Sequence, residues 1–179
     1  MAATVTRHLS AMLRSGALPH VPTVRSKIPD SLRGKLTRDK ADLKLAAFEG
    51  EFAPAVLDLA GVRILLYRPK DVDPTCGAIE DLFAVPPHAR YRKDFIAPEG
   101  YRAHHRVVTL RDEQIEVDPA FSNLRGLPCE VQVVTLGDHI WNELEHDIKY
   151  KTPHGQPTEP QVALLRVLRA QLNTVGESV

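Results

Sequence analysis

Two carboxylates lie in stretches of sequence that are otherwise apolar. The first, Asp58, comes directly before the run 62–67, which is rich in β-branched and aliphatic residues. A buried carboxylate costs free energy unless a partner pairs with it. That partner is either Arg63, in a structural ion pair, or Mg²⁺, a hard cation that prefers oxygen ligands. Asp58 is therefore a candidate metal ligand at the edge of a sheet.

The second carboxylate is Glu130, in the run 128–135. Strand alternation places Glu130, Gln132 and Val134 on one face and Val131, Val133 and Thr135 on the other. The face with Glu130 either points to solvent or lines a polar site. Two strand carboxylates that share Mg²⁺ suit phosphoryl-type transfer, in which positioning and charge neutralisation supply most of the catalysis. Asp58 and Glu130 are thus candidates for catalysis and for metal binding.

A basic cluster precedes both carboxylates and comprises Arg25, Lys27, Arg33, Lys35, Arg38 and Lys40. Charge runs of this kind usually form the solvated face of a helix. Arg and Lys also clamp triphosphates, Arg through forked hydrogen bonds and Lys as a point charge. The backbone of RNA is a third target for the same side chains.

The segment 100–105 combines an aromatic ring, a cation and two imidazoles. Tyr101 is suited to stack on a base, and His105 to hydrogen-bond a phosphate or a transferred group. Half-buried positions at a strand end explain the same residues equally well.

The elements that would position these residues alternate irregularly along the chain. A Pro-bearing connector is expected over 19–22. Strands are expected over 62–67 and near 103–110, 114–118 and 128–135. Helices are expected over 4–16, 29–47, 74–82, 137–151 and 159–172. This order predicts an α+β fold with helices against one mixed sheet. The sequence lacks both G-x-G-x-x-G and the Gly-rich phosphate loop that ends in Gly-Lys-Ser/Thr, so nucleotide binding would depend on side chains and metal.

The composition fits one soluble globular domain with short appendages. The 179 residues are 43% hydrophobic and 26% charged, and 23 basic residues balance 23 acidic ones. Bulk charge therefore indicates no dominant role on nucleic acid or anionic membrane. No stretch approaches the roughly 20 apolar residues of a membrane span. Two cysteines fit a reduced, cytoplasmic compartment.

Four blocks, in order, resemble the synthetase domain of the RelA/SpoT family, the alarmone synthetases. Arg25-Ser26-Lys27 with Ser31 and Lys35 resembles R-x-K…S-x-x-x-K. Residues 58–64 resemble D-x-x-G-x-R-I, and Gly100-Tyr101 with His105 resembles G-Y-x-x-x-H. Residues 130–151 resemble E-x-Q…T…W-x-E-x-E-H-x-x-x-Y-K. The expected form is a small, single-domain synthetase, with a helix and connector over 1–22, the synthetase domain over 23–155 and a helix and tail over 156–179.

The resemblance implies a nucleotidyltransferase-like mixed sheet and transfer of the β,γ-pyrophosphate of ATP to the 3′-hydroxyl of GDP or GTP. Asp58 would bind Mg²⁺, and Glu130 would assist the metal or activate the hydroxyl. The residues that would bind ATP are Arg25, Lys27, Lys35 and Arg63. The acceptor would be bound by Tyr101, which stacks on its base, with His105 and Gln132 beside it.

Two departures from the family pattern concern the acceptor. The family usually has P-K-x-N-G-Y, whereas Pro98-Glu99-Gly100-Tyr101 lacks the Lys and the Asn. Val134 stands where E-x-Q-x-R-T has Arg. Both changes fall where the acceptor phosphates would be bound or where the electrostatics of the site would be tuned.

Three functions therefore stay open: synthesis of guanosine tetra- or pentaphosphate, the same transfer to an adenosine nucleotide or the 3′ end of tRNA, and a catalytically silent nucleotide-binding module. The oligomeric state is open as well. The stripe of Val162, Leu165, Leu168 and Leu172 suits packing either within the chain or against a second copy.

Overall fold

The computed structural model describes most of the chain outside the segment 27–56. The described residues are 1–15, 20–26, 57–58, 60–85, 92–97, 100–117, 119–151 and 157–178. The helix expected over 29–47 lies outside them, as do Lys27 and Lys35.

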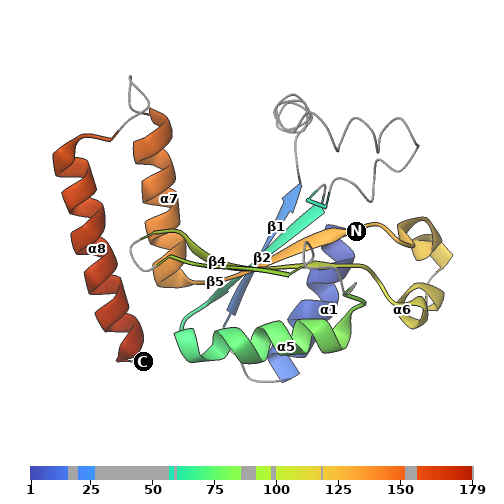
Figure 1. Cartoon of the computed structure of the whole chain (residues 1–179). Coiled ribbons are helices and arrows are strands. Elements are labelled where there is room, and N and C mark those ends of the chain that lie inside the picture. Colours follow the sequence, from blue (N-terminus) through green and yellow to red (C-terminus); the bar gives the residue numbers. More distant parts are fainter. Residues whose placement is uncertain are drawn as a thin grey trace.

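A five-stranded mixed sheet forms the centre of the fold (Figure 1). Its strands are β1 (His20–Ser26), β2 (Ala60–Leu66), β3 (Arg92–Ile96), β4 (Arg102–Val108) and β5 (Cys129–Thr135), in the order β1-β2-β5-β4-β3. The central pair, β2 and β5, is parallel, and every other pair is antiparallel. The expected α+β fold with one mixed sheet is confirmed.

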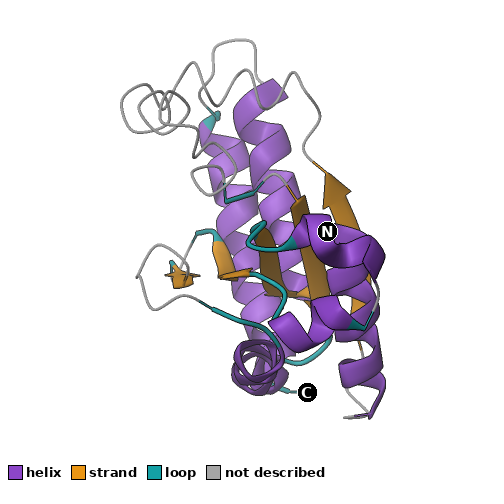
Figure 2. Cartoon of the chain, turned by 90° about the vertical axis from the view of Figure 1, so that its right-hand side faces the viewer, coloured by secondary structure: helices purple, strands orange, loops and turns teal. Residues whose placement is uncertain are grey.

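Helices cover one face of the sheet and one end of it. They are α1 (Ala2–Ser15), α5 (Val72–Leu82), α6 (Asp112–Glu116), α7 (Leu136–Lys151) and α8 (Glu159–Glu177), with short 3-10 helices at Pro69–Asp71 and Pro119–Leu124. In Figure 1, α1 and α5 lie below the sheet, and α7 and α8 stand side by side at its left end. Figure 2 shows the same layers after a quarter turn.

The hydrophobic core lies between the sheet and the helices α1 and α5. In β2, Val62, Ile64 and Leu66 alternate toward this side, as a strand with one covered face requires. Helix α1 contributes Val5, Leu9 and Leu13, whose spacing of four residues places them on one helical face. The opposite face of β2 carries Gly61, Arg63 and Leu65, of which only Arg63 has a polar side chain.

Leu9 offers a test of this core, because its side chain is fully buried. Replacement by alanine should lower the free energy of unfolding by about 2–5 kcal/mol, since a cavity remains. Leu164→Ala, at a position 61% exposed, should change it by less than about 0.5 kcal/mol. Urea unfolding of both variants measures the difference, and equal effects would contradict the placement of α1 against the sheet.

Two strands were missing from the elements expected from the sequence. Strand β1 occupies His20–Ser26, where the prolines indicated a connector. The strand tolerates Pro22 because β1 is an edge of the sheet, where a missing N–H disrupts fewer ladder bonds. Strand β3 is the other edge, and its side chains are mostly exposed, so it lacks the apolar alternation that would have predicted it.

The strand expected near 114–118 is wrong, because Asp112–Glu116 forms the short helix α6. The backbone N–H of Arg111 donates to the Gln114 side chain at 2.9 Å and so caps the first turn. Ile115 is buried, but Val117 is 83% exposed, so their alternation does not mark one covered strand face. The other expected elements in the described part of the chain agree with the structure to within a few residues, although α8 extends beyond 172 to Glu177.

The apolar stripe of α8 packs partly within the chain. Leu165 is buried, and the indole N–H of Trp141 on α7 donates to its backbone carbonyl at 3.0 Å. Among the residues that the structure describes, no helix has the length and apolar character needed to cross a bilayer.

Candidate active site

Polar side chains form a row across three strands on the face opposite α1 and α5. His105 on β4 is paired with Gln132 on β5, and Gln132 is paired with Arg63 on β2. Directly opposite residues in neighbouring strands project from the same face of a sheet. The register therefore brings together three predicted site residues that lie far apart in the sequence.

Hydrogen bonds join this row into a continuous chain. The Tyr101 hydroxyl lies 3.2 Å from His105 Nε2, and His105 Nδ1 lies 3.0 Å from Glu130 Oε1. Gln132 Nε2 donates to Glu130 Oε2 at 2.7 Å, and Arg63 Nε donates to Gln132 Oε1 at 3.3 Å. Glu130 is thus held through both oxygens, between an aromatic side and a cationic side.

The pKa of Glu130 is set by opposing influences. Burial alone would raise it, but the hydrogen bonds and charge of His105, together with the Gln132 amide, outweigh burial and lower the pKa below its ordinary value of 4.5. The negative charge of Asp58 acts in the raising direction. The carboxylate is therefore ionised at neutral pH, and Asp58 is close enough to repel it.

This lowered pKa predicts a pH-dependent contribution to stability. A carboxyl group whose pKa is lower in the folded state stabilises the fold above its unfolded pKa and loses that contribution as pH falls through its folded pKa. Glu130→Gln should therefore lose less unfolding free energy than the wild type between about pH 6 and about pH 3. Urea unfolding at both pH values measures this, and equal losses would show that Glu130 is not stabilised in its charged form.

Helix α7 extends the site beyond Arg63. One Arg63 terminal nitrogen, Nη1, lies 3.1 Å from His139 Nδ1 and donates to Glu143 Oε1 at 2.9 Å. Sequence reasoning did not assign His139 and Glu143 to the site. Their spacing of four residues, on a helix that begins directly after β5, is the signal that would have indicated them.

Phe95 is a third residue that sequence reasoning did not assign to the site. Its ring packs edge-on against Tyr101, with centroids 5.5 Å apart, and against His105 at 5.0 Å. It lies on β3, one of the two strands that were not expected from the sequence. Phe95 supports the ring of Tyr101 from the side.

For most of the remaining predicted residues, the structure gives at most the position of the backbone. Asp58 lies in the turn before β2. Arg25 lies on β1, where it is paired with Gly61, and Gly61 is in turn paired with Glu130. The register thus places Arg25 level with Glu130, two strands away. Lys27 and Lys35 lie outside the described residues.

The two carboxylates suit a divalent cation only in combination with a substrate. Among the described residues, no group of three or more His, Cys, Asp or Glu side chains is arranged to hold a metal ion. Asp58 and Glu130 repel each other, however, and a cation between them would remove that repulsion. Mg²⁺ commonly binds through one or two carboxylates together with substrate phosphates, and this pair fits that pattern.

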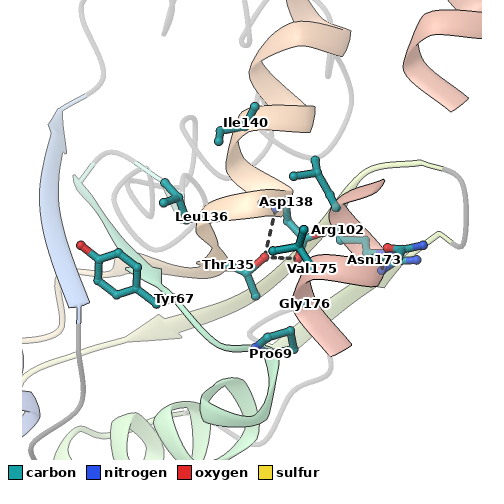
Figure 3. A pocket seen from close by; sticks show the side chains of 12 residues that line it. Tyr67, Pro69, Arg102, Thr135, Leu136, Asp138, Ile140, Asn173, Val175 and Gly176 are labelled. Atoms are coloured by element: carbon teal, nitrogen blue, oxygen red, sulfur yellow. Dashed lines mark hydrogen bonds between the residues drawn. The ribbon is translucent and has the colours of Figure 1, made fainter. Parts of the chain in front are cut away.

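A cavity of about 610 Å³ lies at the other end of the parallel strands (Figure 3). It is bounded by the residue that follows β2, the start of α7 and the end of α8, with Tyr67, Leu136, Ile140 and Asn173 among its walls. None of the predicted site residues lines it.

Residues 24–155 match the family model described as the region found in RelA/SpoT proteins. The chain belongs to the RelA/SpoT family. The match covers the polar row, both carboxylates and all of α7, whereas α8 lies beyond it.

The GTP pyrophosphokinase YjbM of Bacillus subtilis (strain 168) is a relative of this chain, 26% identical over 124 residues. The match covers 63% of this chain and 51% of the relative, so the chain spans about half the length of that protein.

Solved structures of small alarmone synthetase 1 from Bacillus subtilis share the fold. One matches with a TM-score of 0.75 and 20% identity, covering 99% of this chain and 87% of the other. The same synthetase bound to its product pppGpp matches with a TM-score of 0.67 and 20% identity, covering 97% and 84%. Its complex with AMPCPP matches with a TM-score of 0.66 and 18% identity, covering 97% and 82%. The mixed sheet flanked by helices is therefore that of the small alarmone synthetases.

The structure describes one of the two positions at which the sequence departs from the RelA/SpoT pattern. Val134, at the position of the family's Arg, is only 3% exposed and is paired with Leu65 on β2. Val134 and Leu65 therefore form an apolar cross-strand pair at the position where the family has Arg. The other departure, at Pro98 and Glu99, lies outside the described residues.

Proposed function

We propose that this chain transfers the β,γ-pyrophosphate of ATP to the 3′-hydroxyl of GDP or GTP. The observation that carries the proposal is the hydrogen-bond chain from Tyr101 to Arg63, which holds an ionised Glu130 between a base-stacking side and a cationic side. Membership of the family and the fold shared with a synthetase bound to pppGpp support it.

The residues divide between acceptor and donor. The acceptor base stacks on Tyr101, with His105 and Gln132 beside the ribose and phosphates. The phosphates of ATP are held by Arg63 together with Arg25, Lys27 and Lys35, because forked guanidinium groups and ammonium groups suit polyphosphate.

Glu130 and Asp58 carry the transfer itself. Glu130, which is fixed through both oxygens, would accept the proton of the 3′-hydroxyl, or would help to hold Mg²⁺ while solvent water accepts that proton. Asp58 would be a ligand of the metal. Bound Mg²⁺ would neutralise charge on the transferred phosphates. The 3′-oxygen bonds to the β-phosphorus, the bond from that phosphorus to the α,β-bridging oxygen breaks, and AMP leaves.

The buried Val134 favours a second candidate, transfer to a different acceptor. A cation is missing from a position where the family has one, so an adenosine nucleotide or the 3′ end of tRNA is the alternative acceptor.

Reactions with Mg²⁺, ATP labelled at the γ-phosphate and one acceptor each (GDP, GTP, ADP or bulk tRNA) decide between the candidates. Label on GDP or GTP is the expected result. Label on ADP or tRNA alone would replace the proposal by the second candidate. No label on any acceptor, with ATP still bound, would indicate a silent nucleotide-binding module.

A further inference from the structure

We infer that Arg169 on α8 is a positioning residue for the acceptor, because it fixes the backbone beside Tyr101. The inference rests on the proposed function and names a residue outside the family match, which ends at 155. Its basis is a set of contacts between α7, α8 and the segment 100–102.

Arg169 reaches the acceptor segment from a buried position. Its side chain is only 3% exposed, and its Nη2 donates to the backbone carbonyl of Gly100 at 2.7 Å. Gly100 immediately precedes Tyr101, so this bond fixes the peptide from which the tyrosine projects.

The guanidinium of Arg169 is itself held in place. Its Nη1 donates to Asp138 Oδ1 at 2.5 Å, and Asp138 Oδ2 accepts from the Thr135 hydroxyl at 2.7 Å. Its carbon Cζ lies 4.3 Å from the centre of the Trp141 ring, a cation–π contact. Arg169 therefore has one defined orientation, which ends at the Gly100 carbonyl.

The residue on the other side of Tyr101 is anchored as well. Asn142 on α7 donates to the backbone carbonyl of Arg102 at 2.9 Å and accepts from its N–H at 3.4 Å. The Arg102 side chain donates to Asn173 Oδ1 on α8 at 3.0 Å, beside the cavity shown in Figure 3. Both peptide neighbours of the tyrosine are thus bonded to the helical pair.

Gly100 lies in a tight turn against Ala97. A Cβ built on Gly100 would lie 2.9 Å from the Cβ of Ala97, closer than real side chains approach. The Gly100 N–H donates to the Ala97 carbonyl at 3.2 Å. The chain also lacks the family's Lys and Asn directly before Gly100. Contacts from α8 are therefore expected to contribute more to the position of Tyr101 than the residues that precede it.

The test compares Arg169→Gln with Arg169→Lys and with Arg166→Gln, an exposed arginine on the same helix. Arg169→Gln should weaken GDP binding about tenfold and raise the acceptor KM similarly, with the KM for ATP changed less than about twofold. Arg169→Lys, which keeps one cation, should restore part of the loss, and Arg166→Gln should match the wild type. Equal losses for ATP and GDP would overturn the inference.

A double-mutant cycle separates positioning from general destabilisation. If Arg169 acts through Tyr101, Arg169→Gln should have little further effect on GDP affinity in a Tyr101→Ala background. Fully additive effects would overturn the inference. Should Arg169→Gln fail to fold, Asn142→Ala, which frees the other neighbour of Tyr101, takes its place in the same cycle.

Hydrogen exchange of the ligand-free protein keeps this test independent of the proposed function. The amides of 100–102 should exchange at least about tenfold faster in Arg169→Gln, with those of β5 unchanged. Unchanged exchange at 100–102 would overturn the inference whatever the enzyme makes. A wild type that binds neither GDP nor GTP would instead refute the proposed function, and the exchange result would then decide the anchoring alone.

Discussion

Glu130→Ala and Asp58→Ala should each reduce pyrophosphate transfer by at least about a thousandfold, because each removes a charge that the proposed function places at the reacting phosphates. Glu130 is the fixed centre of the hydrogen-bond chain, and Asp58 acts on it electrostatically. Initial rates of AMP release at saturating ATP and acceptor measure the loss.

The fold should survive both changes. The Glu130 side chain lies on the sheet face opposite the hydrophobic core and Asp58 lies in the turn before β2, so circular dichroism should show unchanged secondary structure. Asp73→Ala provides the matched control, because Asp73 is an exposed carboxylate on α5, on the far side of the sheet. Near-normal turnover in either site variant would show that the two-carboxylate assignment is wrong.

Tyr101→Ala is the change with the next largest expected effect, and it should act on the acceptor alone. Stacking of a base on an aromatic ring contributes about 1–3 kcal/mol, which corresponds to a rise of about 5- to 150-fold in the KM for GDP. ATP affinity should change little, because Tyr101 lies at the opposite end of the hydrogen-bond chain from Arg63.

Two further variants separate the parts of this effect. Tyr101→Phe keeps the ring and loses the hydroxyl contact with His105, so it should retain most acceptor affinity. Tyr67→Ala removes a tyrosine that is 53% exposed beside the cavity, outside the site, and should match the wild type. Equal losses of donor and acceptor affinity in Tyr101→Ala would count against the stacking role.

The sequence predicted the central elements well because burial marks them strongly. Strands β2 and β5 are buried on the core face, and their polar residues on the other face made Glu130 a candidate from the pattern, whereas the roles expected for Arg63 and Gln132 came from the family resemblance. The edge strands carry no such signal. Pro22 disfavoured a strand assignment for β1, and the exposed side chains of Arg92–Ile96 gave β3 no apolar alternation.

The contacts between site residues could not be predicted in the same way. They depend on register between strands and on where α7 and α8 pack, which are tertiary properties. His139 and Glu143 reach Arg63 only because α7 stands at the end of β5, and Arg169 reaches Gly100 across 69 positions of sequence. The local sequence pattern indicated which residue types could form a site, and the packing of the strands and helices determined which of them contact one another.

Product stoichiometry tests the proposed reaction most directly. With Mg²⁺, ATP and GDP or GTP, we expect one AMP released for each acceptor that gains a 3′-diphosphate, and no product from Glu130→Ala. Chromatography with mass detection of both products makes the measurement. Release of ADP in place of AMP, or no modified acceptor under conditions where ATP and GDP both bind, would contradict the proposed transfer.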